Sequence, residues 1–137
     1  TNHLESRRIE QQDIDSVVQT RSLSSGELEN KVLRSGSIRR QQARTVRAEV
    51  QSSPYPVIVV GDMNTIPLST TYLMLRCGMR DCFLQTSDGR LGATMFYHHI
   101  PLRLDYIFCT KDLYPQSFCV DTVTCSDHFP VITTLAW

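Results

Sequence analysis

The stretch that decides the fold is Val57-Ile58-Val59-Val60-Gly61-Asp62-Met63-Asn64. Its first four residues are β-branched and apolar, which predicts a short strand that is buried on both faces inside a sheet. A carboxylate and a carboxamide follow two residues apart where that strand ends, and an extended chain points both side chains the same way. Such a pair suits a hydrated cation and a phosphate oxygen, but Gly, Asp and Asn are also ordinary turn formers after a strand.

Helices are predicted on both sides of this strand. Ser37 can cap a helix over residues 37–51, and Pro54 prevents that helix from continuing. Ser69 can cap a second helix, which Gly78 is placed to end. The apolar residues that form one stripe along the first helix are Ile38, Ala43, Val46 and Val50. We expect most of the 36 residues before the first helix to be irregular.

Four segments in the last third of the chain are rich in β-branched and aromatic residues, and turn formers separate them. They cover residues 94–97, 104–109, 118–124 and 129–135. A helix, a strand and a helix followed by several strands, without an internal repeat, indicate an α/β layered sandwich. The loops at the strand ends of such a scaffold are where polar side chains for chemistry are held.

The composition excludes several classes of protein. With 41% hydrophobic and 20% charged residues, the 137-residue chain should fold, and its length is typical of one domain. A net charge of zero gives no global positive field for nucleic acid. The aliphatic run at residues 57–60 is too short to span a bilayer, and the first residues are not a signal peptide. Five cysteines without a Cys-x-x-Cys pair argue against a zinc ribbon or a disulfide framework and favour reduced thiols.

Two further groups of polar residues stand beside predicted strands. Alternation predicts that Arg103, Asp105 and Ile107 share one face of a strand. Asp127 and His128 are adjacent just before the last predicted strand, so they diverge if the chain is extended. A carboxylate that holds an imidazole in one tautomer is a recurrent device of acid/base catalysis, and Asp105 with His128 could form such a pair. Taken singly, each group is as readily explained by an ordinary ion pair.

Together, the three groups resemble the motifs of the endonuclease/exonuclease/phosphatase superfamily, whose fold is DNase I-like. Residues 61–64 match its Gly-Asp-x-Asn, residues 103–107 match its Arg-x-Asp-Tyr-Ile strand, and residues 126–130 match its Ser-Asp-His-x-Pro. The opening Asn2-His3-Leu4 is similar to its Thr-His-Leu segment, with Asn2 in the place of Thr. The resemblance implies an α/β (α+β) fold, the C-terminal half of a four-layer α/β/β/α sandwich with mostly antiparallel sheets.

The resemblance also implies that the chain is part of a larger domain. Family members carry a metal-binding Glu and an Asn on strands that would precede Thr1 in this numbering. Residues 1–137 would then be the C-terminal portion of one such domain without its N-terminal half, and residues 5–36 a variable, partly irregular insertion. Half of a two-sheet sandwich exposes strand edges and apolar faces. We therefore expect the chain to self-associate or to pair with the missing N-terminal half.

The activity that the resemblance implies is hydrolysis of phosphate esters, by a phosphodiesterase, endonuclease or phosphatase. A water attacks phosphorus while Mg²⁺ or Mn²⁺ neutralises charge on the oxygens. Asp62 would orient or deprotonate the water, and Asn64 would hold a phosphate oxygen or that water. His128 would contact the phosphate or act as the base, with Asp105 as its orienting partner.

The remaining roles also follow from the resemblance. Asp127 would be a metal ligand, His3 would donate to a phosphate oxygen or protonate the leaving group, and Arg103 is a candidate substrate contact. Hard oxygen ligands favour Mg²⁺ or Mn²⁺ over zinc. Which histidine is the acid and which the base stays open, as does the substrate among nucleic acid, a phospholipid head group and a sugar phosphate.

The alternative function is that of a catalytically incomplete fragment, an assembly or interaction unit that needs an N-terminal half or another chain. The odd number of free cysteines favours a cytoplasmic location. A membrane anchor in a segment before Thr1 stays compatible with this sequence.

Overall fold

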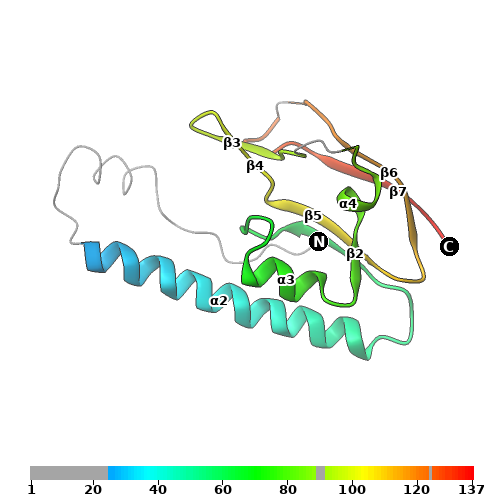
Figure 1. Ribbon diagram of the computed structural model, residues 1–137, viewed down its shortest axis with the longest axis horizontal. Helices are drawn as coiled ribbons and strands as arrows, with labels where there is room; N and C mark the ends of the chain where they lie inside the picture. Colours follow the sequence, from blue (N-terminus) through cyan, green and yellow to red (C-terminus); the bar gives the residue numbers. More distant parts are fainter. Residues whose placement is uncertain (1–24, 89–91, 124) are drawn as a thin grey trace.

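The computed structural model describes residues 25–88, 92–123 and 125–137 (Figure 1). The first part contains α2 (Ser25–Ser52), β1 (Ile58–Asp62), α3 (Thr70–Arg76), β2 (Met79–Asp81) and α4 (Cys82–Thr86). The second part contains β3 (Met95–Tyr97), β4 (Ile100–Leu102), β5 (Asp105–Thr110), β6 (Tyr114–Val120) and β7 (Val131–Ala136). All of the strand pairs in the described residues are antiparallel, which confirms the expected α/β fold with antiparallel sheets.

The central sheet has the strand order β1-β5-β2 and lies between two other layers (Figure 1). Tyr106 and Phe108 of β5 pack toward α2 and α3, in one core cluster with Val59. Ile107 and Cys109, which alternate with them, pack toward the β6–β7 sheet in a second cluster. Strand β5 is therefore covered on both faces. In β1, Val59 is buried toward the helices and Val60 packs partly against the second cluster, but Ile58 is exposed, so the predicted burial on both faces holds only in part.

Helix α2 is longer than the sequence predicted. It begins at Ser25 rather than at residue 37, so residues 25–36 are helical and not irregular. Among the residues of α2 whose burial is described, the buried side chains are Arg39 and Ala43, and the apolar spacing that predicted a helix begins only at Ile38 in the sequence. Gly36 lies inside the helix, where glycine costs only about 1 kcal/mol relative to alanine. No helix in the described part of the chain has the length and apolarity to cross a bilayer.

The end of α2 and both ends of α3 follow the predicted chemistry, whereas Ser37, the predicted cap of the first helix, lies inside α2. Helix α2 ends at Ser52, two residues before Pro54. The hydroxyl of Ser69 accepts a hydrogen bond from the backbone N–H of Tyr72 and caps α3. Gly78 lies just beyond the end of α3 with φ +84°, a conformation that glycine adopts without strain.

Three short elements were not predicted. Strands β2 and β4 have three residues each, too few to show alternation. Helix α4 has five residues and depends on its N-cap Asp81, whose carboxylate accepts from the N–H groups of Phe83 and Leu84.

The turn between β3 and β4 places His98 and His99 at positive φ, without the Gly or Asn that usually marks a hairpin. Strand β6 begins at Tyr114 and ends at Val120, earlier than the predicted strand over residues 118–124.

Candidate active site

The antiparallel register of β1 and β5 brings two carboxylates together at one end of the central sheet. Asp62 lies directly opposite Asp105, and opposed residues of an antiparallel pair project from the same face. That face is the one toward β6 and β7, since Asp105 alternates with Tyr106 and shares its side of the strand with Ile107. Like charges directly opposite each other are unfavourable. This end of the sheet therefore requires positive charge nearby.

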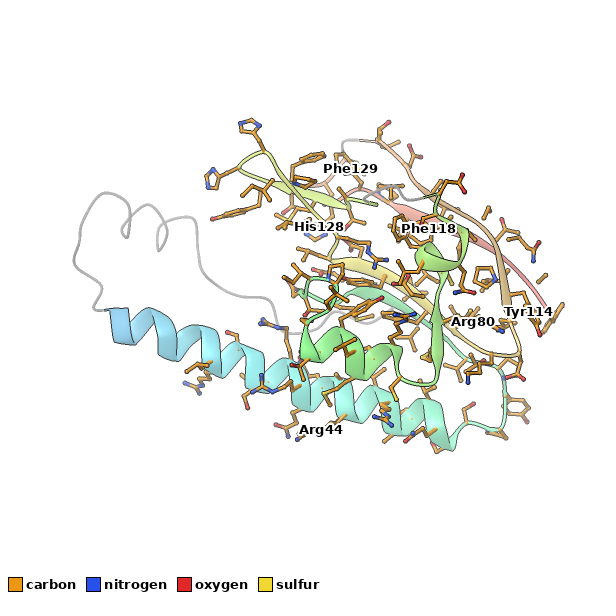
Figure 2. All side chains as sticks on the ribbon, viewed as in Figure 1. Arg44, Arg80, Tyr114, Phe118, His128 and Phe129 are labelled. Atoms are coloured by element: carbon orange, nitrogen blue, oxygen red, sulfur yellow. The ribbon has the colours of Figure 1, made fainter. Side chains whose placement is uncertain are left out.

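His128 can supply positive charge there when its ring is protonated. It lies in the loop between β6 and β7, and its Nδ1 is 2.7 Å from Oδ2 of Asp105. Both side chains are largely buried, with 22% and 15% of their surface exposed. A β-bridge between Met95 and His128 ties this loop to β3, and the ring of Phe129 packs edge-on against Phe96 (Figure 2). The structure therefore brings Asp105 and His128 together from positions 23 residues apart.

The surroundings of His128 favour its charged form. Burial by itself lowers the pKa of the imidazole, but the hydrogen bond and the charge of Asp105, with the charges of Asp62 and Asp127, outweigh it. The net effect is that the pKa of His128 lies above its usual value of 6.5. A bond through Nδ1 leaves Nε2 as the ring nitrogen that can meet a substrate or a water.

Asp62 and Asn64 form a turn as well as a polar pair. The backbone N–H of Asn64 donates to Oδ1 of Asp62 over 2.8 Å, and its side-chain Nδ2 donates to Oδ2 over 3.0 Å. Asn64 has φ +44°, which asparagine tolerates better than most residues. Met63 between them is fully buried, and its N–H donates to the carbonyl of Leu104. The turn therefore holds the Asp62 carboxylate in one orientation at the end of the sheet.

Asp62, Asp105 and His128 form what we call the acid–histidine cluster. One ligand atom of each lies within 4.8 Å of those of the other two, and all three residues are half-buried. The two carboxylates that face each other fit a divalent cation such as Mg²⁺ or Mn²⁺ in charge and in ligand type.

Two residues expected at the site do not lie in this cluster. Asp127 is exposed, and its Oδ1 accepts a hydrogen bond from the hydroxyl of Ser126. It diverges from its neighbour His128, as adjacent side chains do, and within the described residues the possible metal-binding group does not include it. His3 falls among residues 1–24, outside the described residues.

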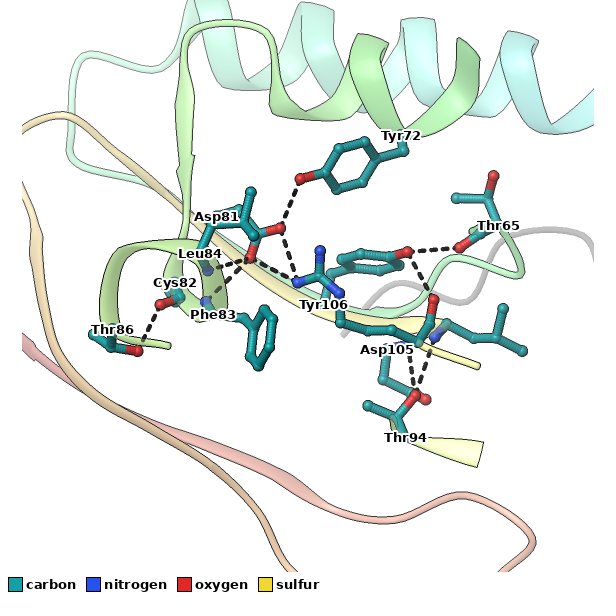
Figure 3. Close-up of polar contacts among 12 residues, drawn as sticks. Thr65, Tyr72, Asp81, Cys82, Phe83, Leu84, Thr86, Thr94, Asp105 and Tyr106 are labelled. Atoms are coloured by element: carbon teal, nitrogen blue, oxygen red, sulfur yellow. Dashed lines mark hydrogen bonds and ion pairs between the residues drawn. The ribbon is translucent and has the colours of Figure 1, made fainter. Parts of the chain in front are cut away.

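Arg103 is buried and paired with Asp81, and its expected contact with the substrate stays a prediction. Its guanidinium forms a 2.9 Å ion pair with Asp81, and both side chains are buried, with 4% and 0% of their surface exposed (Figure 3). The same group lies over the rings of Phe83 and Tyr106. Strand β5 begins only at Asp105, so the alternation that would place Arg103 beside Asp105 does not extend to it.

Thr94 and Tyr106 are buried polar residues whose contacts the sequence did not indicate. The hydroxyl of Thr94 accepts hydrogen bonds from the N–H groups of Leu104 and Asp105 (Figure 3). The hydroxyl of Tyr106 lies 2.8 Å from the carbonyl oxygen of Thr65 and 2.7 Å from that of Arg103. These contacts join the loops on which Asp62 and Asp105 depend. They link distant segments, so a local pattern carries no sign of them.

The chain was then compared with known proteins. The sequence profile of the Endonuclease/Exonuclease/phosphatase family matches residues 8–128. This match includes all three members of the acid–histidine cluster. The comparison with curated proteins finds no match.

Solved structures share the fold. A mannosyl-6-phosphatase from Bacteroides thetaiotaomicron is 22% identical, with a TM-score of 0.63 over 74% of this chain and 46% of its own. The 3′ phosphatase NExo from Neisseria, bound to a product DNA hairpin, is 18% identical, with a TM-score of 0.64 over 78% of this chain and 55% of its own. A family protein from Beutenbergia cavernae is 26% identical, with a TM-score of 0.60 over 74% and 31%. The chain therefore spans about half the length of each of the first two structures and about a third of the last.

Proposed function

The chain belongs to the endonuclease/exonuclease/phosphatase family, and we propose that it supplies part of an active site that hydrolyses phosphate esters with the help of Mg²⁺ or Mn²⁺. The observation that carries this proposal is the acid–histidine cluster, in which two opposed carboxylates and an imidazole converge within 4.8 Å. The structures that share the fold include a sugar-phosphate phosphatase and a DNA 3′ phosphatase, which supports a phosphate ester as substrate. Nucleic acid, a phospholipid head group and a sugar phosphate are the candidate substrates.

His128 is assigned to the phosphate. Its Nδ1 is engaged by Asp105, which holds the ring in one orientation and directs its other nitrogen to the reacting group. The raised pKa keeps a larger share of the imidazole protonated at a given pH than in a free histidine. A charged donor stabilises the negative charge that develops on the phosphoryl oxygens. Of the two roles open to His128, these properties support contact with the phosphate over general-base catalysis.

Asp62 is assigned to the attacking water. Its carboxylate accepts two hydrogen bonds from Asn64, which fix its direction, and it stands opposite Asp105. A fixed carboxylate can orient a water or accept a proton from it. Asn64, held in the same turn, would bind that water or a phosphate oxygen.

Asp62 and Asp105 are the residues in the described part of the chain that would hold a divalent cation. When bound, the cation supplies charge neutralisation to the phosphoryl and departing oxygens. The carboxylates offer the hard oxygen ligands that Mg²⁺ and Mn²⁺ prefer, and a cation would relieve their mutual repulsion. Asp127 and His3 keep their predicted roles, as ligand and as donor to the phosphate, as part of this proposal.

A second candidate is the incomplete unit, which pairs with an N-terminal half or with another copy. The chain spans only 46% of the mannosyl-6-phosphatase and 55% of the 3′ phosphatase. Strands β6 and β7 form a sheet of two strands, and such a sheet needs further strands or packing to be stable. Ile132 of β7 has 52% of its surface exposed, and Ile58 of β1 has 49%. These apolar side chains would be covered by such a partner.

The hydrolase proposal is tested on the full-length protein with three substrates: a DNA hairpin with a 3′ phosphate, a sugar phosphate and sphingomyelin. Each is assayed with EDTA and with added Mg²⁺ or Mn²⁺. We expect cation-dependent release of phosphate or of a phosphorylated product. Asp62→Asn should lower kcat/KM by about 100-fold or more, since it removes a positioned acid or base.

The matched control for Asp62→Asn is Asp112→Asn. Asp112 is exposed and follows β5, at the opposite end of that strand from Asp105. This variant should keep kcat/KM within about twofold of wild type, as exposed substitutions away from a site usually do. Equal activity of both variants, or activity that EDTA leaves intact, would contradict the proposal.

A further inference from the structure

Thr94 makes hydrogen bonds with the backbone at Asp105 and with the backbone of the residue that follows His128. It is fully buried, and its own N–H donates to the carbonyl of Leu102 over 2.8 Å. Its hydroxyl oxygen accepts from the N–H groups of Leu104 and Asp105 over 3.1 and 3.2 Å (Figure 3). Its carbonyl accepts from the N–H of Phe129, the residue after His128, over 2.7 Å. One buried residue therefore joins the start of β5 to the loop that carries the histidine.

These contacts matter because the two partners of the pair come from separate segments. Asp105 begins β5, whereas His128 lies in the loop that leads into β7. A 2.7 Å hydrogen bond between their side chains is at the short end of the normal range and tolerates little relative displacement of the two backbones. The β-bridge between Met95 and His128 extends the same link by one residue.

The hydroxyl of Thr94 provides an acceptor for two backbone N–H groups, which its own backbone does not provide. Any residue at this position could make the hydrogen bonds of its N–H and carbonyl groups, but only a hydroxyl side chain of this size can accept from two adjacent N–H groups. Valine has the same shape without the acceptor, so it would deprive two largely buried donors of a partner. Such donors are costly, and the backbone moves to satisfy them.

We propose that Thr94 is a positioning residue for the site: its hydroxyl sets the backbone at Asp105, and its carbonyl sets the loop of His128, so that the two side chains meet. The catalytic consequence rests on the proposed hydrolase function. The geometric consequence does not, because it concerns only whether the imidazole is held against the carboxylate.

The test compares Thr94→Val, Thr94→Ser and a matched control, Thr110→Val, in the full-length protein. Thr110 stands at the far end of β5, where its hydroxyl accepts from the N–H of Val57 over 3.0 Å. The control therefore removes the same type of hydrogen bond from the same strand, away from the site. Thr94→Ala repeats the loss of the hydroxyl if valine does not pack at this position.

The kinetic readout is the separation of kcat from KM. We expect Thr94→Val to lower kcat by about tenfold or more with KM within about twofold, as misplacement of a reacting group does. Thr94→Ser should restore kcat to within about threefold of wild type, and Thr110→Val should leave it within about twofold. A normal kcat in Thr94→Val, no rescue by serine, or an equal loss in Thr110→Val would overturn the proposal.

A second readout does not depend on activity. Diethyl pyrocarbonate modifies imidazoles, and peptide mass spectrometry gives the rate at His128 relative to the exposed His98 and His99. Thr94→Val or Thr94→Ala should raise this ratio, because the ring is released from Asp105, and Thr110→Val should not. An unchanged ratio in the Thr94 variants overturns the proposal. If the wild type hydrolyses no phosphate ester, the proposed function fails, and this ratio alone decides the role of Thr94.

Discussion

Burial of the His128 ring and its bond to Asp105 act in opposite directions on the pKa of the imidazole, and the bond prevails. The pair therefore couples the charge of one residue to the stability of the site. Folding raises the pKa of His128 above 6.5. The protonated pair therefore stabilises the fold fully at pH values below the unfolded-state pKa of 6.5. This stabilisation is lost as the pH rises through the higher pKa of the native state.

This coupling gives a prediction at the scale of one residue. In EDTA, the wild-type melting temperature should fall as the pH rises above 6.5, because the charged pair is lost. Asp105→Asn should flatten this dependence and lower the melting temperature at pH values below the transition. Differential scanning calorimetry at a series of pH values measures both effects. Asp112→Asn is the control and should keep the wild-type dependence of melting temperature on pH. If Asp105→Asn also keeps the wild-type dependence, the pairing of Asp105 with His128 does not set it, and the prediction is wrong.

Arg103, a residue of one of the three motifs, takes part in a buried ion pair that stabilises the fold. Its ion pair with Asp81 joins β2 and the start of α4 to the residues that lead into β5. Tyr72 of α3 donates to the same carboxylate over 2.8 Å. The buried carboxylate of Asp81 therefore connects α3, the start of α4 and the residues that lead into β5. Loss of either partner would leave an isolated charge in an apolar setting.

At the scale of the elements, we predict that Arg103→Met lowers the free energy of unfolding by about 3 kcal/mol or more, since it leaves the Asp81 carboxylate buried without its cation. Urea unfolding followed by circular dichroism measures this. The control is Arg44→Met on the exposed side of α2 (Figure 2), which should change the free energy of unfolding by less than about 0.5 kcal/mol. Similar stability of the two variants would contradict a structural role for Arg103.

At the scale of the whole molecule, the layers explain why the site lies where it does. Helices α2 and α3 pack on one face of the central sheet, and the β6–β7 sheet packs on the other together with α4 (Figure 1). Only the second face admits a loop from β6 and β7, and Asp62 and Asp105 project from that face. The site therefore forms at the junction of two sheets, as the ends of β1 and β5 meet the segment before β7.

The length of the chain relative to its structural relatives gives a prediction at this scale. The 137-residue chain alone should show less than about 1% of the activity of the full-length protein, and it should associate in a concentration-dependent way because apolar side chains such as Ile132 are exposed. Sedimentation equilibrium and the phosphate-ester assay test this on one preparation. A monomeric and fully active chain would exclude the incomplete unit.

The amino-acid sequence by itself determined the strand that leads to Asp62, the end of α2, the cap of α3 and the residues of the three motifs. Each of these depends on near neighbours: a run of β-branched residues, a serine before a helix, or a polar pair where a strand ends. The tertiary structure alone decided that Arg103 pairs with Asp81, that Thr94 joins Asp105 to the loop of His128, and that Asp127 stays exposed. Those outcomes depend on strand register and on contacts between residues far apart in the chain, and local patterns do not record either.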